Sequence, residues 1–167
     1  MVNSAELHEA VKFLKENKCI SIEYSDGIKF IFDSKNDTEA LRHLNSLQQK
    51  FGILISSDRM ANQCIKEIPE VAWDMMDYAT TPLTLVLNGG QFVSKHLISE
   101  DGSLAIQKLR SGPLFELVSK YGKPLAFFNS DKNQSFKSDF KIVMEQNMVK
   151  EKIVQIRPNG EVEIIAN

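Results

Sequence analysis

The sequence of 167 residues contains few of the residue types that build metal and redox sites: it has two cysteines, three histidines and one tryptophan. Cys19 and Cys64 have neither metal-ligand spacing nor a Cys-x-x-Cys motif, so we expect two buried, reduced thiols. His8, His43 and His96 are far apart in the sequence, and none stands beside a cysteine. Their spacing therefore predicts no metal site.

Long apolar runs and a strong net charge are also lacking. No run approaches the roughly 18 apolar residues that cross a bilayer, and the amino terminus lacks the basic and apolar regions of a secretory signal. We therefore expect a cytoplasmic protein with no membrane partner. The net charge of −2 argues against general binding of polyanions, because that affinity comes mainly from clustered Lys and Arg.

Positive charge is nevertheless concentrated in the second half of the chain. Residues 81–167 hold 11 basic and 9 acidic side chains, whereas residues 1–80 hold 9 and 13. An anion-binding face would draw on the second half, and the alternative is a solvated helix and loop. The lysines of the most basic stretch are Lys132, Lys137, Lys141, Lys150 and Lys152.

Hydrophobic periodicity and turn residues predict one α/β domain over residues 1–167, built as a twisted mixed β-sheet with helices packed on its faces. Asn3 and Glu6 form a capping-box pattern, and Gly122 stands where a left-handed helix cap is expected. Helices are predicted at 3–17, 37–47, 57–66, 69–76, 112–121 and 138–147. Strands are predicted at 19–24, 28–32, 53–55, 81–87, 104–109, 125–128, 153–157 and 162–165, with residues 91–94 pairing back on 82–87.

Motifs that define a reaction are missing. No Gly-rich phosphate loop follows a predicted strand, and no Gly-x-Ser-x-Gly elbow occurs. Carboxylate pairs such as Asp74 and Asp77 have the spacing of a solvated helix face. The residues by themselves thus predict a scaffold and leave its chemistry open.

The order of the elements, and the Gly, Pro and polar residues at their ends, resemble the YrdC-like family of threonylcarbamoyl-adenylate synthases and related proteins described as translation factors. The landmarks occur in order over nearly the whole chain: Asp37-Thr38-Glu39-Ala40, Thr81-Pro82-Leu83-Thr84, Gly112-Pro113-Leu114 and Gly122-Lys123-Pro124-Leu125. The resemblance implies an open α/β sheet that lines a concave basic cleft. In that family the cleft binds ATP, threonine and bicarbonate with Mg²⁺ and makes the adenylate used to form threonylcarbamoyladenosine in tRNA, and members are also described as binding double-stranded RNA.

The family motifs are altered in this chain, and the resemblance assigns nucleotide or substrate binding to what remains of them. Ser25 and Asp26 are the small polar groups left of Pro-Thr-Asp-Thr-x-Tyr-Gly. Lys-x-Arg keeps one of its two cations, a strand arginine is a lysine, and the closing Ser-x-Asn reads Asn-Ser-Asp. Carboxylates near phosphate repel it unless Mg²⁺ intervenes. The full set of candidate binding residues is Ser25, Asp26, Lys50, Thr84, Lys108, Asn129, Ser130 and Asp131, with no catalytic residue assigned.

Three hypotheses stay open from the sequence. The first is a YrdC-like domain that binds nucleotide or RNA with reduced or lost catalysis. The second is an active ATP- and Mg²⁺-dependent synthase, a nucleotidyltransferase. The third is a non-catalytic protein-interaction module, as a monomer or a homodimer, that uses the exposed edge of the terminal hairpin.

Overall fold

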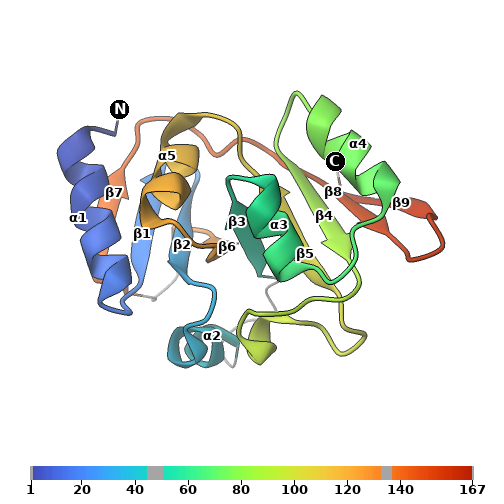
Figure 1. Ribbon diagram of the computed structural model, residues 1–167. Coiled ribbons are helices and arrows are strands. Elements are labelled where there is room, and N and C mark those ends of the chain that lie inside the picture. The colour runs from blue at the N-terminus through green and yellow to red at the C-terminus, as the bar shows by residue number, and fades with distance from the viewer. Residues whose placement is uncertain (1, 45–50, 133–136, 167) are drawn as a thin grey trace.

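The computed structural model describes residues 2–44, 51–132 and 137–166 (Figure 1). The helices are α1 (Ser4–Lys15), α2 (Asp37–Leu44), α3 (Asp58–Cys64), α4 (Glu70–Tyr78), the 3-10 turn η1 (Lys95–Leu97) and α5 (Gly112–Tyr121). The strands are β1 (Ile20–Tyr24), β2 (Gly27–Asp33), β3 (Gly52–Ile55), β4 (Leu83–Leu87), β5 (Leu104–Lys108), β6 (Leu125–Ser130), β7 (Phe140–Val143), β8 (Lys152–Ile156) and β9 (Val162–Ala166).

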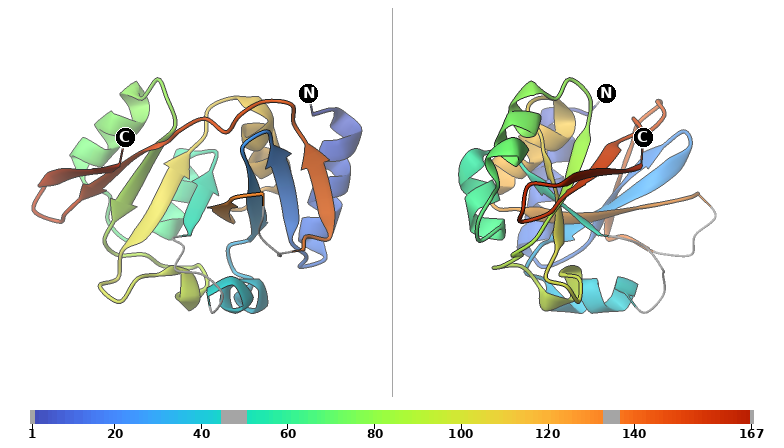
Figure 2. Two further views of the ribbon diagram at one scale, coloured as in Figure 1. Left: turned by 180° about the vertical axis from the view of Figure 1, so that it is seen from behind. Right: turned by 90° about the vertical axis from the view of Figure 1, so that its right-hand side faces the viewer.

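Within the described residues, all the strands form one mixed sheet of nine strands in the order β7-β1-β2-β6-β3-β5-β4-β8-β9. The sheet is strongly twisted at β6, which is seen nearly end-on in Figure 1 and lengthwise in the right view of Figure 2. Helices α1, α3, α4 and α5 lie on one side of the molecule, and α2 lies below the strands with η1 beside it. The predicted mixed α/β architecture is confirmed.

Local sequence signals account for most of the element boundaries. The side chain of Asn3 accepts from the amide of Glu6, and the Glu6 side chain accepts from the Asn3 amide, so α1 begins with the predicted capping box. Helix α5 begins with Pro113 in its first turn and ends at Gly122, whose φ is +82°. Each predicted signal therefore lies at a real helix end.

Large side chains from both the strands and the helices form the core. Phe30, Phe32 and Phe128 are fully buried, and the rings of Phe30 and Phe128 stack with their centroids 4.9 Å apart. Leu14 and Val118 bury the contact between α1 and α5. In the part of the chain that the structure describes, no helix is both long and apolar enough to cross a membrane.

Two predicted elements are wrong. Residues 138–147 do not form a helix, because Phe140 and Ile142 point to one side as strand β7, which pairs in parallel with β1. The apolar spacing there fits either period, and pairing with the edge of β1 decides between them. Residues 91–94 form no strand: Phe92 has a φ of +56°, and the amide of Ser94 donates instead to the carbonyl of Ser34.

Candidate ligand site

A cavity of about 210 Å³ lies between the sheet, the start of α5 and the segment of residues 144–151, which we call the strap. The strap connects β7 to β8 and crosses the upper ends of the strands, as the left view of Figure 2 shows. The polar side chains that line the cavity include Lys29 of β2, Gln107 of β5, Asn129 of β6 and Glu151 of the strap. We call these four residues the cavity cluster.

Strand register places the floor of the cavity on one face of the sheet. Lys29 pairs with Asn129 across β2 and β6, and Gln107 pairs with Thr84 across β5 and β4. Residue Leu54 of β3 pairs with Gln107 on one side and with Leu125 of β6 on the other. Because Leu125 and Asn129 are four residues apart in one strand, all these side chains share a face.

Lys29 is a buried cation in this cavity, with only 7% of its surface exposed. Its Nζ donates to Asn129 Oδ1 at 2.8 Å and lies 4.2 Å from the centroid of the Phe127 ring. Burial lowers the pKa of Lys29 to about 8, partly offset by the charge of Glu151. The amine can therefore change charge near neutral pH while it faces the cavity.

The other polar groups of the cluster differ in how they are satisfied. Thr84 Oγ1 donates to Glu151 Oε2 at 2.9 Å, which fixes the end of the strap on β4. Gln107 is only 6% exposed, and its Oε1 has no hydrogen-bond partner among the described residues. A buried acceptor without a donor costs about 1–3 kcal/mol, so the site is better satisfied when a ligand supplies an N–H or O–H group.

The turn between β1 and β2 holds the strap in place. The amide of Ser25 donates to the carbonyl of Gln146 at 2.8 Å, and the amide of Met148 donates to Asp26 Oδ1 at the same distance. The methyl end of Met148 packs so closely over Gly27 that a Cβ there would lie 2.4 Å from Met148 Cε. The same Cβ would lie 2.9 Å from the carbonyl oxygen of Ser130 in β6, and because the Met148 side chain can move while that backbone cannot, the close approach of β6 is what requires glycine here.

The structure brings only part of the predicted site together. Asn129 lines the cavity, and buried Thr84 reaches it through Glu151. Lys108 lies on the opposite face of its strand from Gln107 and forms an ion pair with Asp58 at the start of α3. Lys108 therefore does not line this cavity with Asn129 but borders a neighbouring hollow, and the binding roles predicted for these residues stay predictions.

The remaining predicted residues have other surroundings. Ser25 and Asp26 lie in the exposed turn that anchors the strap. Ser130 is buried, and its hydroxyl donates to the carbonyl of Asp131 at 3.2 Å, whereas Asp131 itself is exposed. Lys50 lies outside the described residues.

Sequence reasoning missed Lys29, Gln107 and Glu151. In the strand pattern, Lys29 alternates with Ile28 and Phe30 and therefore resembles a solvent-facing position. The signal that could have identified it is the next pair on its own face, Ile31 and Asp33, both of which are buried. A lysine that shares a face with buried residues is itself a candidate for burial.

A second hollow of about 250 Å³ adjoins the cavity and shares Gln107, Pro82, Leu109 and Ser111 with it. It is also lined by Lys108 and Arg110. Both cations are engaged, since Lys108 pairs with Asp58 and Arg110 donates to the carbonyl of Met76. The two hollows therefore lie side by side along the ends of β4 and β5.

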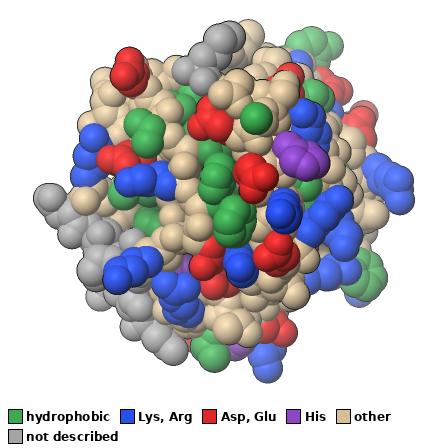
Figure 3. Space-filling view, turned by 90° about the vertical axis from the view of Figure 1, so that its left-hand side faces the viewer, with side chains coloured by type: hydrophobic (Ala, Val, Ile, Leu, Met, Phe, Trp, Pro, Cys, Tyr) green, Lys and Arg blue, Asp and Glu red, His purple; other side chains and the backbone are tan. Residues whose placement is uncertain are grey.

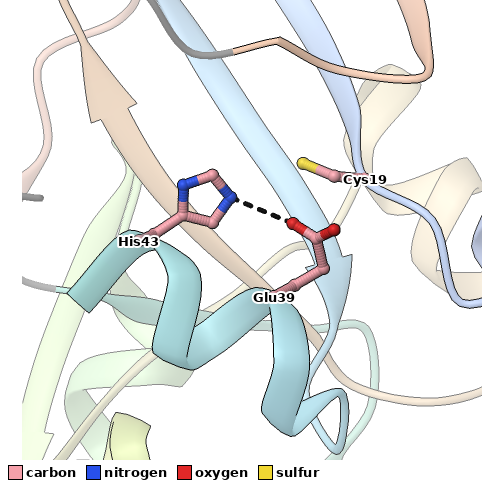
Figure 4. A group of neighbouring side chains, drawn as sticks. All are labelled: Cys19, Glu39 and His43. Atoms are coloured by element: carbon pink, nitrogen blue, oxygen red, sulfur yellow. Dashed lines mark hydrogen bonds and ion pairs between the residues drawn. The ribbon is translucent and has the colours of Figure 1, made fainter. Parts of the chain in front are cut away.

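A different polar cluster is closed inside the molecule (Figure 4). The donor atoms of Cys19, Glu39 and His43 all lie within 4.8 Å of one another, and all three residues are buried. His43 Nε2 and Glu39 Oε2 are 3.1 Å apart. The ring of His43 lies against Phe30, Phe32 and Phe128, and we call the three polar residues the closed cluster.

Comparison with known proteins identifies solved structures that share the fold. No family model and no curated protein sequence matches this chain. Among solved structures, full-length HypF in its phosphate- and nucleotide-bound form matches 96% of the chain with a TM-score of 0.74 and 15% identity. Sua5 of P. abyssi complexed with L-threonine matches 93% with a TM-score of 0.73 and 15% identity, and YciO of E. coli matches 100% with a TM-score of 0.69 and 14% identity.

These similarities show that the chain has the YrdC-like fold that the sequence resemblance predicts. The chain spans 28% of HypF and 52% of Sua5, whereas it spans 93% of YciO. Identities this low carry the architecture and no activity. The function must therefore be argued from the cavity itself.

Proposed function

We propose that this chain is a YrdC-like ligand-binding domain that does not catalyse adenylate synthesis, and that its cavity binds a small carboxylate ligand of the amino-acid class. The observation that carries this proposal is the cavity cluster: a buried lysine, an acceptor without a donor, and a carboxylate around one small space. Sua5, which shares the fold, has been solved with L-threonine.

The groups of the cavity cluster complement a zwitterion. The carboxylate of an amino acid fits Lys29 and the amide nitrogen of Asn129, because charged donors bind carboxylates strongly. Its ammonium group fits Glu151 and the unsatisfied Oε1 of Gln107. Drug-sized ligands occupy pockets of roughly 300–1,000 Å³, so a cavity of about 210 Å³ favours a smaller molecule.

The proposed loss of catalysis follows from the distribution of cations. Adenylate synthesis develops negative charge on phosphate and carboxylate oxygens, and several Lys or Arg side chains must converge on them. Lys29 is the only Lys or Arg among the described residues that lines the cavity, and Glu151 is beside it. One partly neutralised cation supports binding better than phosphoryl-group chemistry.

Isothermal titration with L-threonine, L-serine and L-glutamate tests the binding proposal. We expect wild type to bind one of these amino acids, and Lys29→Met to weaken that affinity by about 10–100-fold through loss of a charge-assisted hydrogen bond. Lys18→Met is the matched control, because Lys18 is half-exposed, pairs with Glu16, lies over the ring of Phe13 and does not line the cavity. Absence of heat with all three ligands at millimolar concentration, or equal affinity in wild type and Lys29→Met, would contradict the proposal.

Pyrophosphate release from ATP tests the proposed loss of catalysis separately. With Mg²⁺, threonine and bicarbonate present, we expect the release rate to equal that of a protein-free blank. Release that depends on both threonine and bicarbonate would instead establish the active synthase that the resemblance leaves open.

Nucleotide binding is the second candidate function, favoured by the second hollow beside the cavity and the two cations that line it. Full-length HypF has been solved in a nucleotide-bound form. ATP with Mg²⁺ would need Lys108 and Arg110 to leave their present partners, Asp58 and the carbonyl of Met76. Titration of wild type with ATP and Mg²⁺ tests this, and Arg110→Met should then lose affinity while Lys18→Met keeps it.

Binding of tRNA or other double-stranded RNA has weaker support. On the side where α1 and β7 lie, Lys and Arg side chains are interspersed with Asp and Glu (Figure 3). Lys141 and Lys132 of the basic stretch lie 3.0 Å and 3.9 Å from the carboxylate of Glu23. Phosphate neutralisation needs cations that are free to release counterions, so we expect no shift of an RNA duplex in a low-salt gel assay.

A further inference from the structure

We propose that Cys19, Glu39 and His43 form a buried binding site for a zinc-class divalent metal ion. The site is separate from the ligand cavity, and the proposal does not depend on the function argued above. It rests on a cysteine and a Glu-His pair of one helix, separate in sequence, which the fold brings together with sulfur, nitrogen and oxygen donors directed at one another (Figure 4).

The helix and the strand that supply the donors are fixed independently of any metal. Glu39 and His43 are four residues apart in α2 and so lie on one face of that helix. Helix α2 begins after Asn36, whose side chain accepts from the amide of Glu39, and this cap sets the first turn. Cys19 immediately precedes β1, and its amide donates to Asp139 Oδ2 at 3.1 Å. The three donors therefore meet on preorganised backbone.

The donor distances suit three of the four positions around a tetrahedral ion after a small adjustment. Zinc bonds of about 2.0–2.3 Å place neighbouring ligand atoms roughly 3.3–3.8 Å apart. His43 Nε2 and Glu39 Oε2 are already 3.1 Å apart, and Cys19 Sγ lies within 4.8 Å of both donor atoms. Rotation about the side-chain torsions of Cys19 and Glu39 moves their donor atoms by about an ångström, which brings the three donors to these distances.

The charge of the proposed site favours a divalent ion. A cysteine thiolate and a glutamate carboxylate bring two negative charges, and the imidazole is a neutral ligand. A divalent ion balances these two charges in an interior where Cys19 and His43 are both 0% exposed, while the partly exposed Arg42 keeps its ion pair with Glu39. In the structure, the thiol has weak hydrogen-bond contacts with the backbone of Ile20, at 3.5 Å, and of Ile31.

The surroundings resemble the outer shell of a metal centre. Arg42 donates to both carboxylate oxygens of Glu39 at 3.3 and 3.4 Å, and to the carbonyl of Lys137 at 3.2 Å. The rings of Phe32 and Phe128 lie against the imidazole of His43. Outer groups of this kind orient ligands and control the local dielectric.

Cobalt substitution tests the site, because the absorption spectrum of bound Co²⁺ depends on the atoms that coordinate it. The full chain is stripped with a chelator and titrated with Co²⁺ and then Zn²⁺. We expect one Co²⁺ per chain, a near-ultraviolet thiolate-to-cobalt band, and displacement of the band by Zn²⁺. No uptake, or uptake without the thiolate band, would overturn the proposal even if every variant failed to fold.

Matched cysteine variants identify the sulfur ligand. Cys19→Ser should abolish the thiolate band and weaken metal affinity by at least about 100-fold, whereas Cys64→Ser should keep both, because Cys64 is also a buried free thiol but lies outside the cluster. A band that survives in Cys19→Ser and disappears in Cys64→Ser would assign the metal elsewhere. Saturating Zn²⁺ should also raise the unfolding midpoint of wild type by about 5–10 °C and leave that of Cys19→Ser unchanged.

Discussion

Two polar clusters lie on opposite faces of the sheet near strand β2, and they differ in what surrounds them. Lys29 points to the cavity cluster, while its neighbour Phe30 points to the opposite face and contacts His43 of the closed cluster. The cavity cluster borders about 210 Å³ of space and keeps an acceptor without a donor. The closed cluster is enclosed by aromatic rings.

This difference separates polar groups that are enclosed by packed side chains from polar groups that border space for a ligand. Polar atoms packed among rings must satisfy one another or a bound ion, because no space is left for a larger molecule. Polar atoms around a cavity can lack a hydrogen-bond partner in the free protein, at a cost in stability. A bound ligand offsets that cost when it supplies the missing hydrogen bond. Substitutions at the two clusters should therefore change stability in opposite directions.

The largest effect is expected at the packing of the closed cluster. Phe128→Ala removes a fully buried ring that stacks on Phe30 and lies 4.6 Å from the His43 ring centroid. We expect it to lower the free energy of unfolding by about 3–5 kcal/mol in urea denaturation. Tyr78→Ala, at a side chain that is 83% exposed, is the control and should change stability by less than about 0.5 kcal/mol. Equal losses in the two variants would contradict the assignment of the core.

At the cavity cluster, Lys29→Met should reveal a cost of burying charge. The pKa of Lys29 falls from its ordinary 10.5 to about 8 on folding, so between these values the unfolded chain binds more protons than the folded chain. Stability due to Lys29 then rises with pH across that window, because the penalty of the buried charge disappears.

The measurement is the difference in unfolding free energy between wild type and Lys29→Met from pH 7 to pH 10.5. It should move in favour of wild type by about 2–3 kcal/mol. Taking the difference removes the contributions of Tyr121 and Cys19, whose pKa values are raised by burial and which are common to both proteins. A difference that is flat across this range would show that Lys29 is not a desolvated cation.

A smaller change of opposite sign to the Phe128 variant is expected at Gln107. Gln107→Leu replaces a buried amide that has an unsatisfied oxygen with a side chain of similar size, and we expect a gain of about 1 kcal/mol in stability. The same variant should lose affinity for the amino-acid ligand. Stability that falls together with affinity would indicate that the amide already has a partner in the folded protein.

The elements that the sequence predicted correctly are those that depend on neighbouring residues. Alternation and the Ser25-Asp26-Gly27 turn predict the first hairpin, and Gly122 predicts the end of α5. Strand β7 was missed because its four residues carry too short a pattern to separate strand from helix. Its conformation is decided by the free edge of β1, which lies more than a hundred residues away in the chain.

The candidate site was predicted in part, for the same physical reason. Thr84 and Asn129 stand in strands that the resemblance aligns, and they reach the cavity. Lys29 lies in an equally well predicted strand, yet its burial depends on the strap and on α5, which no local pattern near Lys29 reports. The closed cluster joins positions 19, 39 and 43, and only the docking of α2 on the sheet brings them together.

The smallest effect on global stability is expected where the strap meets the turn. Asp26→Ala removes the acceptor of the Met148 amide in an exposed setting, and it should lower the free energy of unfolding by about 1 kcal/mol or less.

The informative readout for Asp26→Ala is local hydrogen exchange. The Met148 amide should exchange much faster in the variant, whereas the amide of Leu85, in a central strand, should keep its protection. If a loosened strap also speeds ligand association without changing the affinity of Lys29 for a carboxylate, the strap controls access to the cavity cluster. Unchanged exchange at Met148 would show that contacts such as Met148 over Gly27 are sufficient to hold the strap closed.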